Sequence, residues 1–306
     1  MTTILLLGRN GQVGSELENQ LAGLGTLVAL GHAELDLADP QAIRATLERI
    51  RPDLVVNAAA YTNVDLAESQ PDAAMAVNGT APGLIAQQLR TYGGALLHYS
   101  TDYVFDGARG TPYTEDDVPN PLNVYGASKL AGEQAIVASG AAYLILRTSW
   151  VYSHRGKNFV TVIRDHAQSQ RELKIVNDQS GSPTWARTIA RMTRAILDRC
   201  AGKLADCQGI YHLAAAGATT RYGLAEKIVG LMGQNFRQGH FVPPLLRAVG
   251  SSHFPAPAVR PAYSALSSSR LETRLGITMP RWEDELEAFW GSSADPGEIR
   301  PHRHAL

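Results

Sequence analysis

The seven residues Gly8-Arg9-Asn10-Gly11-Gln12-Val13-Gly14 decide the fold, because they join a short apolar run to a stretch with helical spacing. The apolar run covers residues 3–7 and the helical pattern covers residues 12–24, so the glycines lie in a strand–loop–helix unit. Glycine here lets the backbone turn sharply and approach a phosphate closely, and the N–H groups that open the helix attract anions. The loop therefore predicts a nucleotide-binding site at the start of the chain.

Apolar runs and helical patterns alternate along the first half of the chain. The strand-like runs cover residues 3–7, 26–30, 54–57, 95–99 and 143–146, and the helical patterns cover residues 12–24, 40–50, 78–92 and 124–138. The runs are continuous rather than alternating, which is typical of strands covered on both faces. The pattern predicts an α/β fold: a doubly wound, mostly parallel sheet (Rossmann-like) with helices on both sides.

The second half is less regular and predicts a smaller C-terminal α/β domain that binds the substrate. Helical patterns cover residues 159–169, 185–200 and 281–289, and a long loop rich in proline and serine covers 241–261. Two strand-like runs, 173–176 and 210–213, are expected to join the first sheet. We therefore divide the chain into a dinucleotide-binding domain (1–150), a mainly substrate-binding domain (151–290) and a flexible tail (291–306).

The composition excludes several classes of protein. The net charge of −1 offers no basic field for nucleic acid, and no apolar run is long enough to span a bilayer. The N-terminus lacks the features of a signal peptide. Cys200 and Cys207 do not have the CxxC spacing, so we expect reduced thiols. These observations predict a cytoplasmic protein.

The glycine spacing, GxxGxxG, resembles that of the short-chain dehydrogenase/reductase superfamily. An acidic residue about 20 positions further on should hold the adenosine ribose, and Asp36, followed by Leu37, is the candidate. No acid follows residues 26–30 directly to repel a 2′-phosphate, and Arg9 could attract one, although it could equally be a solvated loop charge. We therefore predict NADPH as the cofactor and leave the use of NADH open.

A tyrosine and a lysine four residues apart, Tyr125 and Lys129, match the pattern YxxxK within a predicted helix. This spacing puts both side chains on one face, where the ammonium is expected to lower the pKa of the phenol and make it useful for proton transfer. A third group should come from the carboxyl end of a central strand, where ligands bind in such folds. Thr101 is the first candidate to polarise a substrate ketone, and Ser100 is the alternative.

Four longer strings carry a closer resemblance. They are NAAAYTNVDLAE at 57–68, HYSTDYVFDG at 98–107, PLNVYG with KLAGE between 121 and 133, and LRTSWVY at 146–152. Together they are similar to the dTDP-4-dehydrorhamnose reductase family of extended short-chain reductases, from Met1 to about Phe289.

The resemblance implies reduction of the C4 ketone of dTDP-4-dehydro-L-rhamnose, the last step to dTDP-L-rhamnose. By similarity, Thr101, Tyr125 and Lys129 are catalytic. Together, the glycine loop and the resemblance give these candidate cofactor-binding residues: Gly8, Arg9, Gly11, Gln12, Val13, Gly14, Asp36, Leu37, Ala60, Tyr61, Thr62, Tyr125 and Lys129. The candidate substrate-binding residues are Thr101, Asp102, Tyr103, Trp150, Asn158 and Arg260. A guanidinium such as that of Arg260 suits a diphosphate, because its fork can hold two oxygens.

One position departs from the family. Some members are described as dimers that Mg²⁺ bridges through glutamates, and Glu16 fits the first of these positions. Arg187 occupies the position that would carry the second glutamate, and a cation there repels a metal ion. We therefore predict no metal site and leave open whether the chain forms a homodimer.

Two other functions stay open at this point. The first is another reductase or an epimerase acting on sugar nucleotides, because such enzymes share the same catalytic trio. The second is a non-catalytic regulatory subunit that binds NADP, although the intact trio argues against it. The expected partner is a sugar nucleotide, with neither nucleic acid nor membrane.

Overall fold

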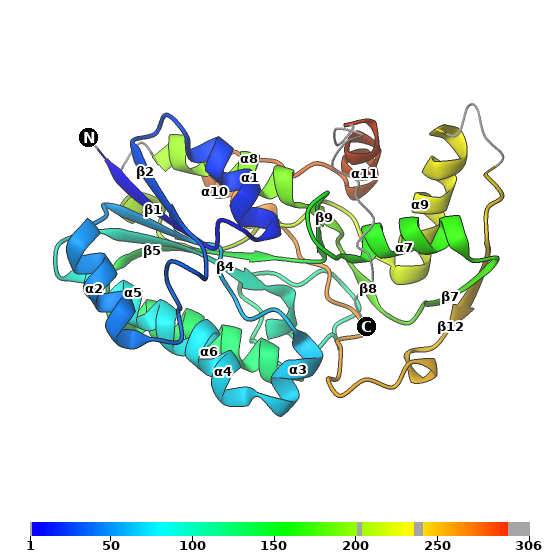
Figure 1. The fold of residues 1–306 in the computed structure, drawn as a ribbon, viewed down its shortest axis with the longest axis horizontal. Helices are drawn as coiled ribbons and strands as arrows, with labels where there is room; N and C mark the ends of the chain where they lie inside the picture. Colours follow the sequence, from blue (N-terminus) through cyan, green and yellow to red (C-terminus); the bar gives the residue numbers. More distant parts are fainter. Residues whose placement is uncertain (1, 201–203, 236–240, 293–306) are drawn as a thin grey trace.

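Six parallel strands form the central sheet of the computed structural model, which describes residues 2–200, 204–235 and 241–292 (Figure 1). Their order across the sheet is β2-β1-β3-β4-β5-β10. The strands are β1 (Thr3–Leu7), β2 (Thr26–Leu30), β3 (Leu54–Asn57), β4 (Ala95–Thr101), β5 (Ala142–Thr148) and β10 (Gly209–His212). The predicted doubly wound parallel sheet is confirmed, and β10 joins it beside β5 as expected. The strand order reverses between β1 and β3, which is where such folds bind nucleotides.

Helices cover both faces of this sheet (Figure 1). On one face, α2 (Pro40–Ile50), α5 (Ala81–Arg90) and α6 (Val124–Ser139) pack their apolar sides on the sheet. On the other face lie α1 (Gln12–Leu21), α8 (Ala186–Cys200) and α10 (Ser269–Leu275). The strand side chains between the two helical layers, such as Leu6 and Val55, are fully buried. This double cover explains why the strands read as continuous apolar runs.

The segment between β3 and β4 contains more helix than the sequence pattern predicted. It comprises α3 (Val64–Ser69), α4 (Pro71–Met75), the π-helix η1 (Ala76–Thr80) and α5. Asn63 caps α3, and Pro71 stands at the first turn of α4, where its missing N–H costs nothing. Figure 1 shows α3 and α4 at the end of the sheet from which the glycine loop also leaves.

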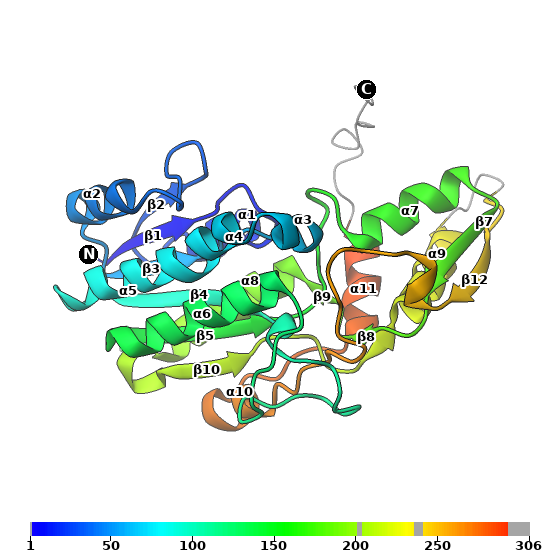
Figure 2. The same cartoon turned by 90° about the horizontal axis from the view of Figure 1, so that it is seen from below.

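The remaining elements form a smaller layer beyond the carboxyl ends of the central strands (Figure 2). Three helices, α7 (Phe159–Ser169), α9 (Arg221–Asn235) and α11 (Trp282–Gly291), share an apolar core with β7 (Glu172–Val176). The prediction that β7 joins the first sheet is wrong, because it pairs in parallel with β12 (Leu245–Val249). Only alternate residues of β7 are buried, as in a strand with one covered face. The strand β12 also lies inside the stretch expected to be a loop.

Several shorter elements complete the described chain. They are β6 (Val151–Tyr152) paired with β9 (Thr184–Trp185), β8 (Ser180–Gly181) paired with β11 (Thr219–Thr220), and the 3-10 turns η2 (Asp102–Val104), η3 (Leu204–Cys207) and η4 (Ser251–His253). Cys200 and Cys207 form a disulfide, so the expectation of two reduced thiols is wrong. No described helix is long and apolar enough to cross a membrane. The predicted tail at 291–306 lies outside the described residues from position 293 onward.

Candidate active site

The glycine loop makes the close backbone approach that its sequence predicted. Gly8 follows β1 with φ +84°, and a Cβ there would lie 2.6 Å from the backbone nitrogen of Ala59. A Cβ on Gly14 would lie 2.0 Å from the carbonyl oxygen of Gly8. The first turn of α1 therefore packs directly on the loop, and its N–H groups face the crevice beside β1.

A cavity of about 560 Å³ follows this loop along the carboxyl ends of the strands. Most of the predicted cofactor residues line it: Gly8, Gly11, Gln12, Val13, Asp36, Leu37, Ala60, Tyr61, Thr62, Tyr125 and Lys129. Asn10, His32, Ser100 and Val151 also line it, although the sequence did not single them out for the cofactor. We call this cavity the nucleotide crevice.

Two predicted cofactor residues, Arg9 and Gly14, do not line the nucleotide crevice. Gly14 lies one turn inside α1 and serves the packing of helix against loop. The guanidinium of Arg9 donates to the carboxylate of Glu18 at 2.7 Å and to the carbonyl of Ala29 at 3.3 Å. Arg9 thus forms a surface ion pair with Glu18, and it does not line the nucleotide crevice.

The predicted phenol–lysine pair lies on the first turns of α6. Asn123 caps this helix by accepting from the N–H of Gly126, which fixes the start of the helix at Val124, one residue before Tyr125. Lys129 is 2% exposed, and its Nζ donates to the carbonyl of Tyr99 at 2.6 Å and lies 3.1 Å from Nε2 of His98. Burial lowers the pKa of Lys129 to about 8, and the charge of Glu133 partly opposes this.

The electrostatics of the phenol differ from the expectation. Burial raises the pKa of Tyr125, and a hydrogen bond with Thr101 lowers it only in part. The hydrogen bonds of Lys129 go to Tyr99 and His98 on the neighbouring strand and not to the phenol. The phenol is therefore fully protonated at neutral pH, as a proton donor must be.

The end of β4 brings two hydroxyls and a carboxylic acid together. Thr101 Oγ1 donates to Asp102 at 3.2 Å and accepts from the N–H of Tyr103 at 3.1 Å. Burial raises the pKa of Asp102, although Ser149 donates to its carboxyl at 3.0 Å. The buried hydroxyl of Ser100 has no partner in the described chain. Ser100 lines the nucleotide crevice, whereas Thr101 does not.

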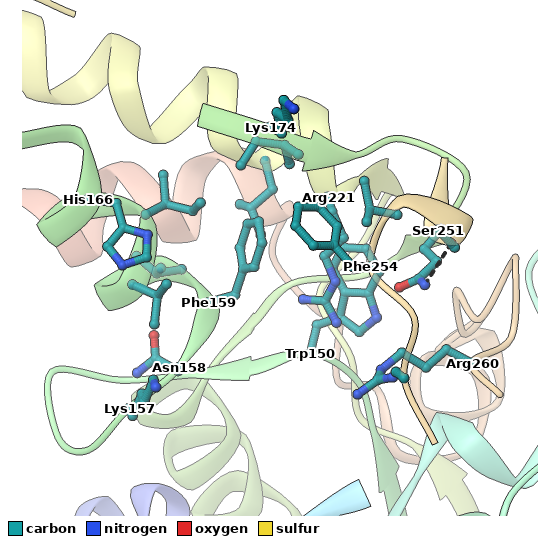
Figure 3. Close-up of a pocket in the computed structure, with 18 of the residues that line it drawn as sticks. Trp150, Lys157, Asn158, Phe159, His166, Lys174, Arg221, Ser251, Phe254 and Arg260 are labelled. Atoms are coloured by element: carbon teal, nitrogen blue, oxygen red, sulfur yellow. Dashed lines mark hydrogen bonds between the residues drawn. The ribbon is translucent and has the colours of Figure 1, made fainter. Parts of the chain in front are cut away.

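A second cavity, of about 1330 Å³, opens between the sheet and the smaller layer (Figure 3). Trp150, Asn158 and Arg260 line it as predicted, whereas Thr101, Asp102 and Tyr103 lie outside its lining. Three residues, Gln12, Thr62 and Val151, line both cavities, so the two adjoin. We call the second one the substrate cavity, since ligands in such folds bind beyond the carboxyl ends of the strands.

Trp150 is fixed in this cavity from both sides. Its backbone has φ +45°, and a Cβ on Gly181 would lie 2.4 Å from its indole ring. The guanidinium of Arg221 stacks on that ring at 3.6 Å from the centroid and also lies 5.1 Å from the ring of Phe159. Figure 3 shows Trp150, Arg221 and Phe159 gathered on one wall. Sequence reasoning missed Arg221, because its helix α9 was not predicted.

The other predicted substrate residues have internal partners as well. Arg260 donates to the carboxylate of Asp65 at 2.7 Å, which lowers the pKa of that acid. Asn158 caps α7 by accepting from Thr161, and its amide nitrogen donates to Gln12 at 3.0 Å. These contacts hold both side chains at the mouth where the two cavities adjoin.

The positions predicted to hold or exclude a metal ion form an ion pair. Arg187 Nε lies 3.2 Å from a carboxylate oxygen of Glu16, and its guanidinium stacks on Trp185 at 4.8 Å. Within the ranges that the structure covers, no three histidine, cysteine or carboxylate side chains gather as metal ligands would.

Comparison with known families identifies relatives of this chain. A family model described as the RmlD substrate binding domain matches residues 1–294. The chain belongs to the RmlD family. A dTDP-4-dehydrorhamnose reductase of Burkholderia thailandensis is 46% identical over 91% of this chain and 95% of its own length.

Two solved structures with the same name share this fold and confirm the resemblance to the RmlD family. The one from Clostridium acetobutylicum is 33% identical with a TM-score of 0.86, covering 94% of this chain and 98% of its own. The one from Bacillus anthracis, in complex with NADP, is 31% identical with a TM-score of 0.87, covering 96% and 100%.

Proposed function

We propose that this chain uses NADPH to reduce the C4 ketone of dTDP-4-dehydro-L-rhamnose to dTDP-L-rhamnose. One observation carries the proposal: the protonated phenol of Tyr125 lines a nucleotide crevice that adjoins a cavity large enough for a sugar nucleotide. Carbonyl reduction needs a proton donor at the meeting point of these two ligands. The names of the RmlD relatives support the choice of sugar nucleotide.

The nucleotide crevice fits NADP in its shape and its polar groups. Gly8 turns the loop at φ +84° against the backbone of Ala59, and the loop leads into the N-terminus of α1, where a pyrophosphate is favoured. The unpartnered hydroxyl of Ser100 offers a hydrogen bond to a ligand in the crevice wall. We assign Asp36 and Leu37 to the adenosine, and Lys129 to the ribose near the reacting ring.

NADPH, when bound, supplies the hydride that reduces the ketone carbon. The chain supplies the proton: Tyr125 holds it at neutral pH because burial raises the pKa of the phenol. Thr101 donates to Asp102 at the end of β4, and in this proposal its hydroxyl turns to the developing oxyanion when the substrate binds. Proton donation of this kind accelerates a reaction by about 10²–10⁴-fold.

The substrate cavity holds the nucleotide end of the substrate in this proposal. Trp150 lies on the wall of this cavity, where Gly181 and Arg221 hold its ring in place. Arg221 and Arg260 place two guanidinium groups on the cavity wall, and such groups hold diphosphate oxygens in pairs. Binding energy from this remote handle positions the ketone.

A direct assay tests the proposal. The purified chain is mixed with dTDP-4-dehydrorhamnose and NADPH, cofactor oxidation is followed by absorbance, and the product is identified by mass. We expect stoichiometric oxidation and a product two hydrogens heavier. Tyr125→Phe should lose about 10²–10⁴-fold in kcat while still binding NADPH, since only the proton donor is removed. Tyr143→Phe is the matched control, because Tyr143 lies on β5 and lines neither cavity.

The alternatives give different results in the same assay. An epimerase would change the sugar without net oxidation of NADPH. A regulatory subunit would bind NADPH and show no turnover. A wild-type rate in Tyr125→Phe would exclude the assigned role of the phenol, whichever reaction occurs.

A further inference from the structure

A stretch of irregular backbone, residues 254–260, follows η4 and runs along the substrate cavity. We call it the strap. Phe254 at its start and Arg260 at its end line this cavity together with Trp150 (Figure 3). Ala258 is the only buried residue of the strap, so apolar packing holds little of it in place. The position of the strap therefore depends on polar contacts.

The end of the strap is hydrogen-bonded to two elements of the nucleotide-binding part. The carbonyl oxygen of Val259 accepts from Nδ2 of Asn123, the residue before α6, at 2.8 Å. Arg260 donates to the carboxylate of Asp65 on α3 at 2.7 Å, and the N–H of Ala258 lies 3.4 Å from the same carboxylate. Asn123 is 6% exposed, whereas the side chain of Asp65 is 40% exposed and screened by water. The bond from Asn123 is therefore the better shielded attachment.

The same asparagine holds the first turn of α6. Its Oδ1 accepts from the N–H of Gly126 at 2.8 Å, and the N–H of Val124 donates to Glu68 on α3, also at 2.8 Å. The first N–H groups of a helix have no partner within the helix, so these outside acceptors fix where the turn lies. Tyr125 stands between the two held residues. The backbone that carries the phenol is therefore held on both sides.

The two polar atoms of the Asn123 amide serve different elements. The oxygen accepts from the helix and the nitrogen donates to the strap, so the orientation of the amide is defined by both partners. Aspartate and serine cap helices as asparagine does, but neither has an amide nitrogen. The bond to the strap is therefore a second role, which a substitution can separate from capping.

We infer that Asn123 is a positioning residue that joins the strap to the start of α6 and so keeps the wall of the substrate cavity at a fixed spacing from the phenol of Tyr125. In the proposed function, Arg260 holds the diphosphate of the substrate and Tyr125 gives a proton to its ketone. Because one molecule must reach both groups, this spacing decides whether the ketone meets the phenol. That consequence rests on the proposed function, whereas the link between the strap and α6 does not.

Amide hydrogen exchange, followed by nuclear magnetic resonance, tests the link without an assay of activity. Asn123→Asp and Asn123→Ser both keep an oxygen that caps α6 and remove the amide that donates to Val259; the first adds a charge and the second does not. We expect the N–H of Ala258 to exchange about 2–10-fold faster in both variants, because one buried bond is lost. The N–H of Gly126, which reports the cap, should exchange at the wild-type rate. An unchanged rate at Ala258 in both variants would overturn the inference.

The wild-type chain gives a second measurement that needs no substitution at position 123. The side-chain amide protons of Asn123 should exchange at least about 10-fold more slowly than those of Asn63, which caps α3 from an exposed position. Equal exchange of the two amides would show that Asn123 does not hold the strap. Asn63→Asp is the matched control variant, since it changes another asparagine cap in the same way, and Ala258 should keep its wild-type rate there.

Kinetics separate the consequence from the link. If the chain reduces the sugar nucleotide, Asn123→Asp and Asn123→Ser should lower kcat/KM for it by about 10-fold and leave NADPH affinity unchanged, because the spacing affects only the substrate. Asn63→Asp should keep the wild-type kcat/KM. A wild-type kcat/KM in variants whose strap exchanges faster would reject the positioning role. Absence of turnover in all of these proteins, with the exchange results as expected, would reject the proposed reaction and leave the link standing.

Discussion

Two adjacent hydroxyls at the end of β4 differ in what they touch. Thr101 bonds to Asp102, whereas the buried hydroxyl of Ser100 has no partner in the described chain and Ser100 lines the nucleotide crevice. Under the proposed function, we expect Thr101 to serve the reacting oxygen and Ser100 to serve the cofactor. The sequence alone left that choice open, because neighbouring residues on a strand both carry a hydroxyl.

Separate substitutions of the two hydroxyls distinguish these roles. Thr101→Val should lower kcat by about 10²-fold, because an oxyanion donor is lost, and should leave NADPH affinity unchanged. Ser100→Ala should weaken NADPH binding by about 1 kcal/mol and leave kcat near wild type. Steady-state kinetics and fluorescence titration with NADPH measure both effects. Thr101→Ser is the matched control and should stay active; a larger kcat loss in Ser100→Ala would reverse the assignment.

The stacked guanidinium of Arg221 gives a prediction about the substrate alone. Arg221→Lys should raise KM for the sugar nucleotide by about 10-fold, since a planar stacked cation of this kind contributes about 1–2 kcal/mol. The affinity for NADPH should not change, because Arg221 does not line the nucleotide crevice. The control is Arg187→Lys, which alters another guanidinium stacked on a tryptophan but outside both cavities. Equal effects of the two substitutions would contradict a substrate role for Arg221.

At the scale of elements, the loop between β1 and α1 has no room for a side chain at the positions where its backbone contacts other backbone. In Gly8→Ala, the new Cβ would meet the backbone of Ala59, and φ +84° is unfavourable for alanine. We expect loss of NADPH binding and a free energy of unfolding lower by about 1–3 kcal/mol. Gly230→Ala is the control, since a Cβ there meets nothing within 4 Å in the middle of α9. It should stabilise the chain by about 0.5–1 kcal/mol, and denaturant unfolding measures both.

Local spacing predicted the elements that carry their own pattern. The glycine loop and the pair Tyr125 and Lys129 were found because one turn of loop or helix defines each of them. The helix α9 was missed because α7, α11 and β7 all pack against it, so its apolar residues do not follow one side. The strand β7 was found but given the wrong partner, since a strand pattern does not name its neighbour.

Contacts between distant elements account for the rest of the site. Nothing in the spacing of residues 98 and 129 shows that the lysine turns toward the histidine, because the sheet and α6 bring them together. In the same way, Trp150, Gly181 and Arg221 meet only after three separate segments have packed. The sequence therefore predicted most of the candidate site residues, but it did not predict the residues that contact them.

At the scale of the whole molecule, buried neutral histidines make folding depend on pH. Burial lowers the pKa of His212 to about 3, whereas an unfolded chain protonates histidine near 6.5. Above about pH 6.5 neither state binds this proton, and the full stability is present. As the pH falls below 6.5, only the unfolded state gains the proton, so stability drops by about 1.4 kcal/mol per pH unit until the folded pKa is reached.

Urea unfolding between about pH 7 and pH 5 checks this dependence. His212→Asn keeps a donor for the carbonyl of Tyr113, which His212 Nδ1 contacts at 3.1 Å, and removes the titrating ring. The variant should lose less stability on acidification than the wild type. His253→Gln, at an exposed histidine, should follow the wild type. Identical slopes in all three proteins would contradict the assignment.

The residues to which we assign the proton chemistry lie on β4 and α6, whereas most of the substrate cavity is lined by segments that follow β5. This separation along the chain has an evolutionary meaning. The later segments are free to diverge and accept another sugar or another nucleotide base while the acid–base chemistry is inherited unaltered. A new specificity would then arise from substitutions in the walls around Trp150 and Phe254.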